Sequence, residues 1–227
     1  MATGLMRKQT LPKLLTMALL ALTSCTGKAP PPAPPRVPRV VLVHGIFEDG
    51  KKFDMFKRGL EKRGFDCYVP KMKPRDGRGG LEKLAVGLKQ DIDTKFGPNE
   101  PISIVAFSMG GIVSREYLQH LGGSARCENL ITISSPHHGT KVAWLYPTKG
   151  AEQMRPGSQF LTELANTEHK LGNMRVTSCR TPMDLVILPT TSSVWKRAEN
   201  LEYPVILHPF MLNSQRVLAD VEQRLLK

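Results

Sequence analysis

The chain has 227 residues, 41% apolar and 23% charged, a composition typical of a folded protein with a sizeable core rather than of a disordered chain. Lysine and arginine total 32 against 20 acidic residues, a formal charge of +12. Only 6% of the residues are aromatic and none interleave with a basic stretch, which argues against a nucleic-acid partner. The sequence contains no repeat of about 20–50 residues, so solenoids and propellers are excluded.

The first 24 residues predict an export signal. Arg7, Lys8 and Lys13 form a basic region, and a short apolar run follows over residues 14–22. That run falls short of the roughly 18 residues that a membrane-spanning helix needs. A basic region followed by a short apolar run is typical of a secretory signal peptide.

The residues around Cys25 resemble the processing site of bacterial lipoproteins. Residues 22–25 read Leu-Thr-Ser-Cys, and the resemblance implies cleavage before Cys25 and lipidation of its thiol. Acyl chains anchor firmly because each buried methylene contributes about 0.8 kcal/mol. We therefore expect a membrane-anchored protein of the bacterial cell envelope. Thr26 rather than Asp follows the cysteine, which favours the outer membrane. An ordinary signal with a chance cysteine is the alternative.

The organisation predicted for the whole chain has three parts. The signal peptide occupies residues 1–24. The lipidated cysteine and a proline-rich spacer occupy residues 25–38, where proline fixes an extended backbone. One folded domain occupies residues 39–227.

Three further cysteines, Cys67, Cys127 and Cys179, lie within the domain. An oxidising envelope allows one disulfide among them, with one thiol left over. Their spacing fits no zinc site. We therefore expect neither a metal nor another cofactor, and the sequence gives no sign of an oligomeric state.

Apolar periodicity predicts strands that alternate with helices along this domain. The expected strands cover residues 37–43, 65–69, 101–107, 127–134, 174–179 and 203–207, and the expected helices 53–63, 81–96, 112–121, 158–165 and 213–226. Residues 136–156 predict an irregular loop. Such alternation builds a parallel sheet with helices on both faces, and its sites lie in the loops at the carboxyl ends of the strands.

Residues 106–111, Ala-Phe-Ser-Met-Gly-Gly, carry the strongest chemical signal. They lie between a predicted strand and a predicted helix. A nucleophilic serine needs a sharp strand-to-helix turn with small neighbours, as in the G-x-S-x-G motif. Ala106 replaces the first glycine of that motif. The pattern favours Ser108 as a nucleophile over an incidental serine in a glycine-containing connection.

Together with two other motifs, this turn resembles the α/β-hydrolase lipases, and most closely the small bacterial triacylglycerol lipases. His44-Gly45-Ile46 ends the first predicted strand, and residues 135–140, Ser-Pro-His-His-Gly-Thr, follow the fourth. The resemblance extends from about Val40 to the C-terminus. It implies an α/β fold of the α/β-hydrolase type, with a mostly parallel central sheet between two helical layers.

Ester hydrolysis passes through an oxyanion that two backbone N–H groups must stabilise. The N–H of Met109, directly after the nucleophile, is one candidate. The resemblance implies that of Ile46 as the other. We expect the His44 side chain to brace this turn rather than to act as a catalyst. The alternative for His44-Gly45 is an ordinary turn at the end of a strand, with no role in an oxyanion site.

In this fold the acid and the base follow the serine in the order Asp or Glu, then His. Asp184 is the only aspartate between Ser108 and the last predicted strand, so it is the expected acid. The alternative is that Asp184 only caps a turn. Glu199 and Glu202 are the fallback acids. His208 follows the last predicted strand and is the expected base. Its rivals, at another strand end, are His137 and His138.

Three aromatic residues are candidate substrate contacts: Phe47, His137 and Trp144. Residues 141–156 contain apolar side chains among Pro and Gly residues. This pattern fits an acyl-chain groove or a partial lid over the site, and it fits equally a loop that packs on its own core.

These patterns predict a serine hydrolase that cleaves carboxylic esters, with an ester or lipid as substrate. A phospholipid deacylase or acyltransferase on the same residues is one alternative. A non-catalytic envelope lipoprotein that binds lipid or a partner is another.

Overall fold

The computed structural model describes Met1 and residues 37–227. The expected signal peptide, Cys25 and most of the spacer lie outside the described residues. Residues 37–227 belong to one compact unit. No helix among the described residues is both long and apolar enough to cross a membrane.

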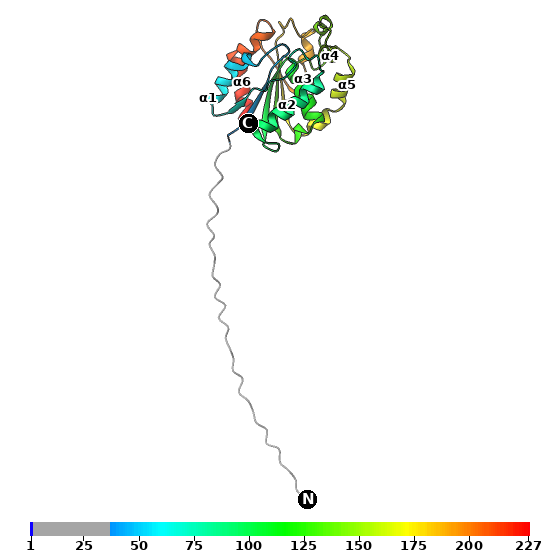
Figure 1. Ribbon diagram of the computed structural model, residues 1–227. Coiled ribbons are helices and arrows are strands. Elements are labelled where there is room, and N and C mark those ends of the chain that lie inside the picture. The colour runs from blue at the N-terminus through cyan, green and yellow to red at the C-terminus, as the bar shows by residue number, and fades with distance from the viewer. Residues whose placement is uncertain (2–36) are drawn as a thin grey trace. The chain divides into compact units, whose positions relative to one another are not determined.

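A six-stranded parallel sheet forms the centre of this unit, with the order β2-β1-β3-β4-β5-β6 (Figure 1). The α/β-hydrolase type of fold expected from the sequence is confirmed. Because all strands run the same way, their carboxyl ends meet at one edge of the sheet. The strands are β1 (Arg39–Val43), β2 (Asp66–Tyr68), β3 (Ile102–Phe107), β4 (Cys127–Ile133), β5 (Arg175–Arg180) and β6 (Glu199–Glu202).

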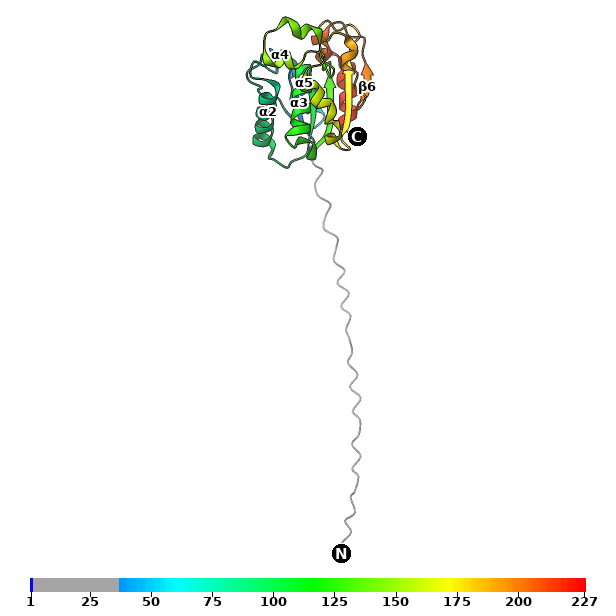
Figure 2. The ribbon, with the colours of Figure 1, turned by 90° about the vertical axis from the view of Figure 1, so that its right-hand side faces the viewer.

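Helices cover both faces of the sheet (Figures 1 and 2). One layer contains α2 (Leu81–Phe96), α3 (Met109–His120) and α5 (Gln159–Asn166), and the other contains α1 (Asp54–Lys62) and α6 (Gln215–Leu225). The short helix α4 (Lys149–Gln153) precedes α5.

Alternate side chains of the central strands enter the two core layers. Ile104 and Ala106 of β3 pack with the α2 and α3 side, while Val105 and Phe107 pack with the α1 and α6 side. Every residue of β3 is buried. The near-continuous apolar runs of β1 and β3 are therefore the pattern of strands covered on both faces.

The last strand lies earlier than the sequence predicts. Residues 203–207 were expected as the strand, but β6 is formed by Glu199–Glu202, which pairs with β5 along one side only. An edge strand is exposed and carries polar side chains, so its apolar signal is weak. Pro204 also lacks the N–H that a ladder requires.

Two other elements differ from the expectation. Helix α3 starts at Met109 rather than at residue 112, so the helix begins directly after Ser108. Within residues 136–156, which were expected to be irregular, α4 and the short 3₁₀ helix Lys141–Leu145 form. The Thr148 hydroxyl caps α4 by accepting a hydrogen bond from the Ala151 N–H.

The three cysteines of the domain are all free and buried, so the possible disulfide is not formed. Burial raises the pKa of each of the three thiols to about 12. They are therefore protonated at neutral pH and chemically inert.

The packing of α2 on the sheet gives a matched stability test. Leu88 is 1% exposed and Val86, on the same helix, is 44% exposed. We expect Leu88→Ala to lower the free energy of unfolding by about 2–5 kcal/mol, because it removes buried methyl groups and leaves a cavity. Val86→Ala should change it by no more than about 0.5 kcal/mol. Urea unfolding followed by far-UV circular dichroism measures both, and equal values would contradict the packing described.

Candidate active site

Ser108 occupies the sharp turn between β3 and α3. Its backbone has φ 53° and ψ −127°, a conformation that a residue with a side chain rarely adopts. The turn is closed by Gly110, where a Cβ would collide with the carbonyl oxygens of Val43 and His44. This close approach places Ser108 beside the end of β1 and at the positive end of the α3 dipole.

The turn after β1 is held by its own hydrogen bonds. The Gly45 N–H donates to Glu48 Oε2 at 3.1 Å, and the Phe47 N–H donates to the carbonyl of Arg75 at 2.8 Å. Within residues 37–227 the Ile46 N–H has no hydrogen-bond acceptor. The first N–H groups of a helix also lack partners inside the helix, and that of Met109 is the first of α3. Neither expected oxyanion donor is therefore engaged by a described residue.

His44 is fully buried beneath this turn. Its Nδ1 donates to the Gly45 carbonyl at 2.9 Å. Burial lowers the pKa of His44, so the ring is neutral at physiological pH. These contacts fit the bracing role expected for it.

Asp184 and His208 meet at the carboxyl edge of the sheet. His208 Nδ1 donates to Asp184 Oδ2 at 2.8 Å, and the two residues are 6% and 3% exposed. The other carboxylate oxygen accepts from the N–H groups of Val186 and Ile187 at 2.8 and 2.9 Å. Burial alone would raise the pKa of Asp184, but the hydrogen bond from His208 and those two N–H groups lower it below its ordinary value. Asp184 is thus a fixed, ionised acceptor for the His208 ring.

The fallback acids lie elsewhere. Glu199 and Glu202 are on the edge strand β6, where they pair with Arg224 and Arg180. Neither contacts His208, so the structure brings only Asp184 to the histidine.

A cavity of about 280 Å³ opens where these residues meet. Ser108 and His208 both line it, together with the two residues whose N–H groups are the oxyanion candidates, Ile46 and Met109. The remaining lining is mostly apolar and comes from the end of β3 and from the segments that follow β1, β4, β5 and β6: Phe47, Phe107, Pro136, Val142, Ala143, Tyr146, Ala151, Met154, Val186, Ile187 and Pro209, with Glu48, Lys52 and Thr140. In residues 37–227, no cluster of three or more His, Cys, Asp or Glu side chains could hold a metal.

The palmitoyl protein thioesterase family model matches residues 39–168, more than half of the chain. The chain belongs to this family. The matched stretch contains Ser108 and the turn after β1, and it ends before Asp184 and His208.

Solved structures similar to this thioesterase-family chain are α/β-hydrolases. The mature lipase BlEst2 of Bacillus licheniformis has a TM-score of 0.68 at 17% identity, covering 86% of this chain and 94% of its own. Lipase B of Aspergillus fumigatus has a TM-score of 0.72 at 16% identity, covering 84% of this chain and 53% of its own. An extracellular α/β-hydrolase from Paenibacillus has a TM-score of 0.57 at 14% identity, covering 82% and 97%. A search of the curated proteins found no match.

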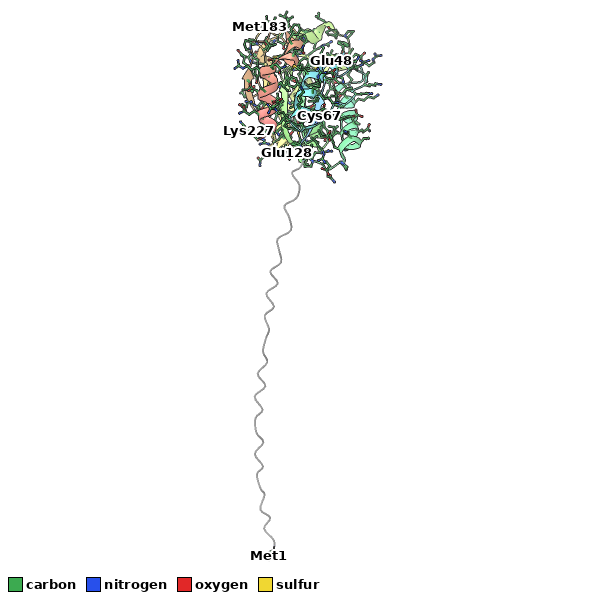
Figure 3. The ribbon with its side chains drawn as sticks, turned by 90° about the vertical axis from the view of Figure 1, so that its left-hand side faces the viewer. Met1, Glu48, Cys67, Glu128, Met183 and Lys227 are labelled. Atoms are coloured by element: carbon green, nitrogen blue, oxygen red, sulfur yellow. The ribbon has the colours of Figure 1, made fainter. Side chains whose placement is uncertain are left out.

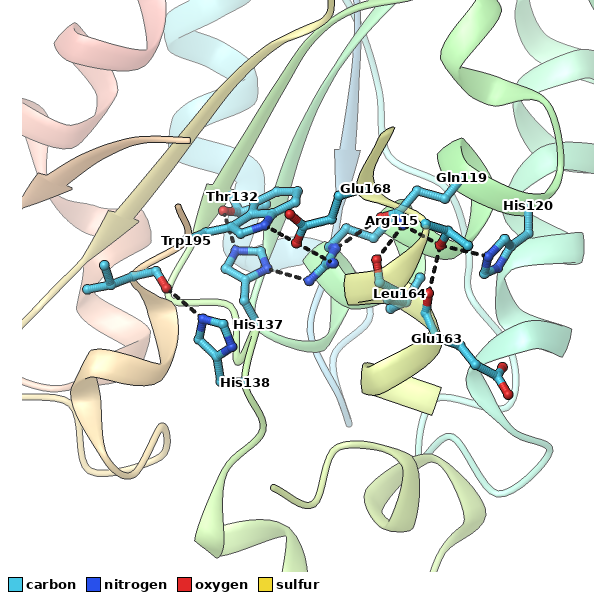
Figure 4. A network of polar contacts seen from close by, with 12 residues as sticks. Arg115, Gln119, His120, Thr132, His137, His138, Glu163, Leu164, Glu168 and Trp195 are labelled. Carbon is cyan, nitrogen blue, oxygen red and sulfur yellow. Dashed lines mark hydrogen bonds and ion pairs between the residues drawn. The ribbon is translucent and has the colours of Figure 1, made fainter. Parts of the chain in front are cut away.

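Two of the expected substrate contacts do not line the cavity. His137 is 2% exposed and is stacked on Trp195, with ring centroids 4.5 Å apart. It also contacts Thr132 Oγ1 at 3.0 Å and the Arg115 guanidinium at 3.5 Å (Figure 4). Trp144 is 63% exposed and packs against Arg155. Of the three residues, only Phe47 lines the cavity.

The network around His137 explains why that residue is structural. Glu168 accepts hydrogen bonds from both Arg115 and Trp195 Nε1, at 3.1 and 2.5 Å. The network therefore joins α3 to the loop after β4 and to residues 190–195. His138, the other rival base, points outward and contacts the Val194 carbonyl.

Sequence patterns missed the residues that support the site. Thr140 Oγ1 donates to the Val186 carbonyl at 2.7 Å and accepts from the Leu188 N–H at 3.0 Å, which fixes the loop carrying Asp184. Glu48 orients the turn after β1 and is itself paired with Lys52 at 2.6 Å. The four-residue spacing of Glu48 and Lys52 indicates that the two side chains can form an ion pair. It does not indicate that the pair lies beside the site.

The environment of His137 gives a pH test. Burial, with the charges of Arg115 and His138, holds the pKa of His137 well below 6.5. Below pH 6.5 the unfolded chain binds a proton at this site that the folded chain does not, so stability falls on acidification by up to about 1.4 kcal/mol per pH unit. NMR titration should show the His137 ring uncharged in the folded chain at pH 5.5 and titrating normally in urea. Protonation near pH 6.5 in the folded chain would contradict the burial.

Proposed function

We propose that this chain is a serine hydrolase that cleaves fatty acyl esters or thioesters through Ser108, His208 and Asp184. The observation that carries the proposal is the common cavity: the strained Ser108 and the His208 ring, held by Asp184, both line one apolar space. The family membership adds the thioester to the ester as a substrate class.

The reaction follows from this arrangement. His208 takes the proton of Ser108 Oγ, which attacks the acyl carbonyl carbon. The N–H groups of Ile46 and Met109 stabilise the oxyanion. The bond from the carbonyl to the leaving oxygen or sulfur then breaks, and His208 gives its proton to the departing alcohol or thiol. Water repeats the cycle on the acyl-enzyme and releases the fatty acid. Asp184 keeps the His208 ring in the required tautomer throughout.

Exposed apolar side chains around the cavity support a fatty acyl substrate. Eight of them lie in the segments that follow β1, β4, β5 and β6, each within three residues of one that lines the cavity: Phe47, Trp144, Leu145, Tyr146, Met183, Leu185, Ile206 and Phe210. We call these eight residues the apolar rim. Met183 lies at the same end of the molecule as Glu48, opposite Glu128 and Lys227 (Figure 3). Exposed apolar side chains gathered near a pocket are typical of a lipid or ligand site.

Replacement of the nucleophile tests the proposal. We expect Ser108→Ala to lower turnover of p-nitrophenyl esters, from acetate to palmitate, by at least about 10³-fold, because no covalent intermediate forms. A fluorophosphonate should label the unchanged chain and not this variant.

Ser135→Ala is the matched control. Ser135 is a buried serine at the neighbouring strand end, its Oγ has no partner among the described residues, and its loss should leave turnover within a few-fold. No turnover on any ester and no labelling of Ser108 would instead favour a non-catalytic lipid-binding role.

We further propose that lipid at Cys25 anchors the domain in the bacterial cell envelope, in the outer membrane rather than the inner. In a Gram-negative host, an alkyne-labelled fatty acid should be incorporated into the chain and lost in Cys25→Ser. Cys67→Ser, which removes a buried thiol, should keep the label. Label that persists in Cys25→Ser would overturn the anchor.

A further inference from the structure

A second hollow adjoins the catalytic cavity. This groove, of about 650 Å³, shares Phe47 with the cavity as a common wall. Four of its other lining side chains are basic and one is acidic: Lys73, Arg75, Arg78, Lys83 and Asp76. We call it the basic groove.

Most of the positive charge in the basic groove is unpaired. Arg78 folds onto Asp76, with its Nε 2.8 Å and a terminal nitrogen 2.7 Å from Asp76 Oδ2. The side chains of Lys73, Arg75 and Lys83 are exposed and form no ion pair with any residue of the described part of the chain. By contrast Lys89, on the same helix as Lys83, pairs with Asp93. The groove therefore presents three cations to an anion from outside.

The groove is fixed relative to the reacting atoms. The carbonyl of Arg75 accepts from the Phe47 N–H, one residue after the oxyanion candidate Ile46. Gly77 packs close to Met109, since a Cβ on it would lie 3.7 Å from the Met109 sulfur. The Gly77 carbonyl also accepts from the Gly150 N–H of α4 at 3.0 Å. The loop of residues 73–80 is thus hydrogen-bonded to the turn after β1 and to α4, and it packs against Met109.

The cavity is lined mostly by apolar side chains and the groove mostly by basic ones, so each suits a different part of one substrate. The apolar cavity suits the acyl chain. When the acyl group is transferred to Ser108, the alcohol or thiol departs from the carbonyl carbon. The polar space next to the cavity, into which it can extend, is the basic groove. Phosphate is the anion that lysine and arginine clusters bind well through charge-assisted hydrogen bonds.

We propose that the basic groove binds a phosphate on the leaving group of the substrate. The preferred substrate is then a fatty acyl ester or thioester whose alcohol or thiol carries phosphate. This inference rests on the proposed function. Two sources share the chemistry: a glycerophospholipid, and a soluble thiol carrier with phosphate such as coenzyme A.

Two matched pairs of substrates test the inference and separate the sources. Dipalmitoyl phosphatidylglycerol is compared with dipalmitoylglycerol, each at low mole fraction in neutral detergent micelles. Palmitoyl-coenzyme A is compared with palmitoyl-N-acetylcysteamine. In one pair or both we expect kcat/KM to be at least about tenfold higher for the phosphate-bearing member at low salt, and the pair that responds identifies the source. Because exposed charges are screened, most of this preference should vanish in high salt.

The triple variant Lys73→Gln/Arg75→Gln/Lys83→Gln should lower this preference about tenfold. The matched control, Lys62→Gln/Lys170→Gln/Arg175→Gln, removes the same charge from exposed positions near the amino edge of the sheet and should change it less than twofold. No preference in either pair would overturn the inference. So would an equal loss in the control, which would make net charge rather than the groove responsible.

A binding measurement keeps this test independent of catalysis. Calorimetry of the full-length Ser108→Ala chain compares lysophosphatidylglycerol with monopalmitoylglycerol. Tighter binding of the phosphate ligand, lost in the groove variant, supports the groove even if no substrate is turned over, an outcome that would reject the proposed function alone. Equal binding of the two ligands rejects the groove and leaves the hydrolase proposal intact.

Discussion

The close approach of α3 to the end of β1 is the constraint on which the site depends. Gly110 lies so near the carbonyl oxygens of Val43 and His44 that no side chain fits between them. This contact brings the turn at Ser108 and the turn at Ile46 to one point, although more than sixty residues separate them in the chain. It also accounts for the backbone strain at Ser108, which persists because β3 and α3 are both locked in the core.

The other side of the site is assembled from the loops after β5 and β6. Asp184 reaches its position because two backbone N–H groups fix one carboxylate oxygen and leave the second for His208. Thr140 ties this loop to the loop after β4, so three strand ends share one hydrogen-bonded frame. Such support holds the His208 ring in place with little freedom to turn, as preorganised sites require.

The sequence predicts the sheet and most helices, because apolar periodicity is a local signal. The pairing of Asp184 with His208 was expected from the chain order that the resemblance to the α/β-hydrolases implies. The sequence fails to predict the position of a residue where a contact with a distant part of the chain determines it. His137 follows a strand end, as a site residue would, but Trp195, distant in the sequence, covers it. The edge strand β6 is polar because it is exposed, so the apolar residues 203–207 after it were taken for the strand instead. Helix α4 is only five residues long, and a helix that short has almost no periodicity to detect.

In the reaction proposed above, esters and thioesters both undergo attack by Ser108 on a carbonyl carbon, and they differ only in the leaving group. The residues that perform the attack therefore cannot select between these substrates, nor among leaving groups of either kind. Discrimination must come from surfaces that contact the acyl chain or the leaving group. In this chain those surfaces are distinct: the apolar rim and cavity on one hand, and the basic groove on the other, with Phe47 between them. We therefore expect the connections after β1, β4, β5 and β6 and residues 73–83, rather than the residues around Ser108, to set the substrate preference.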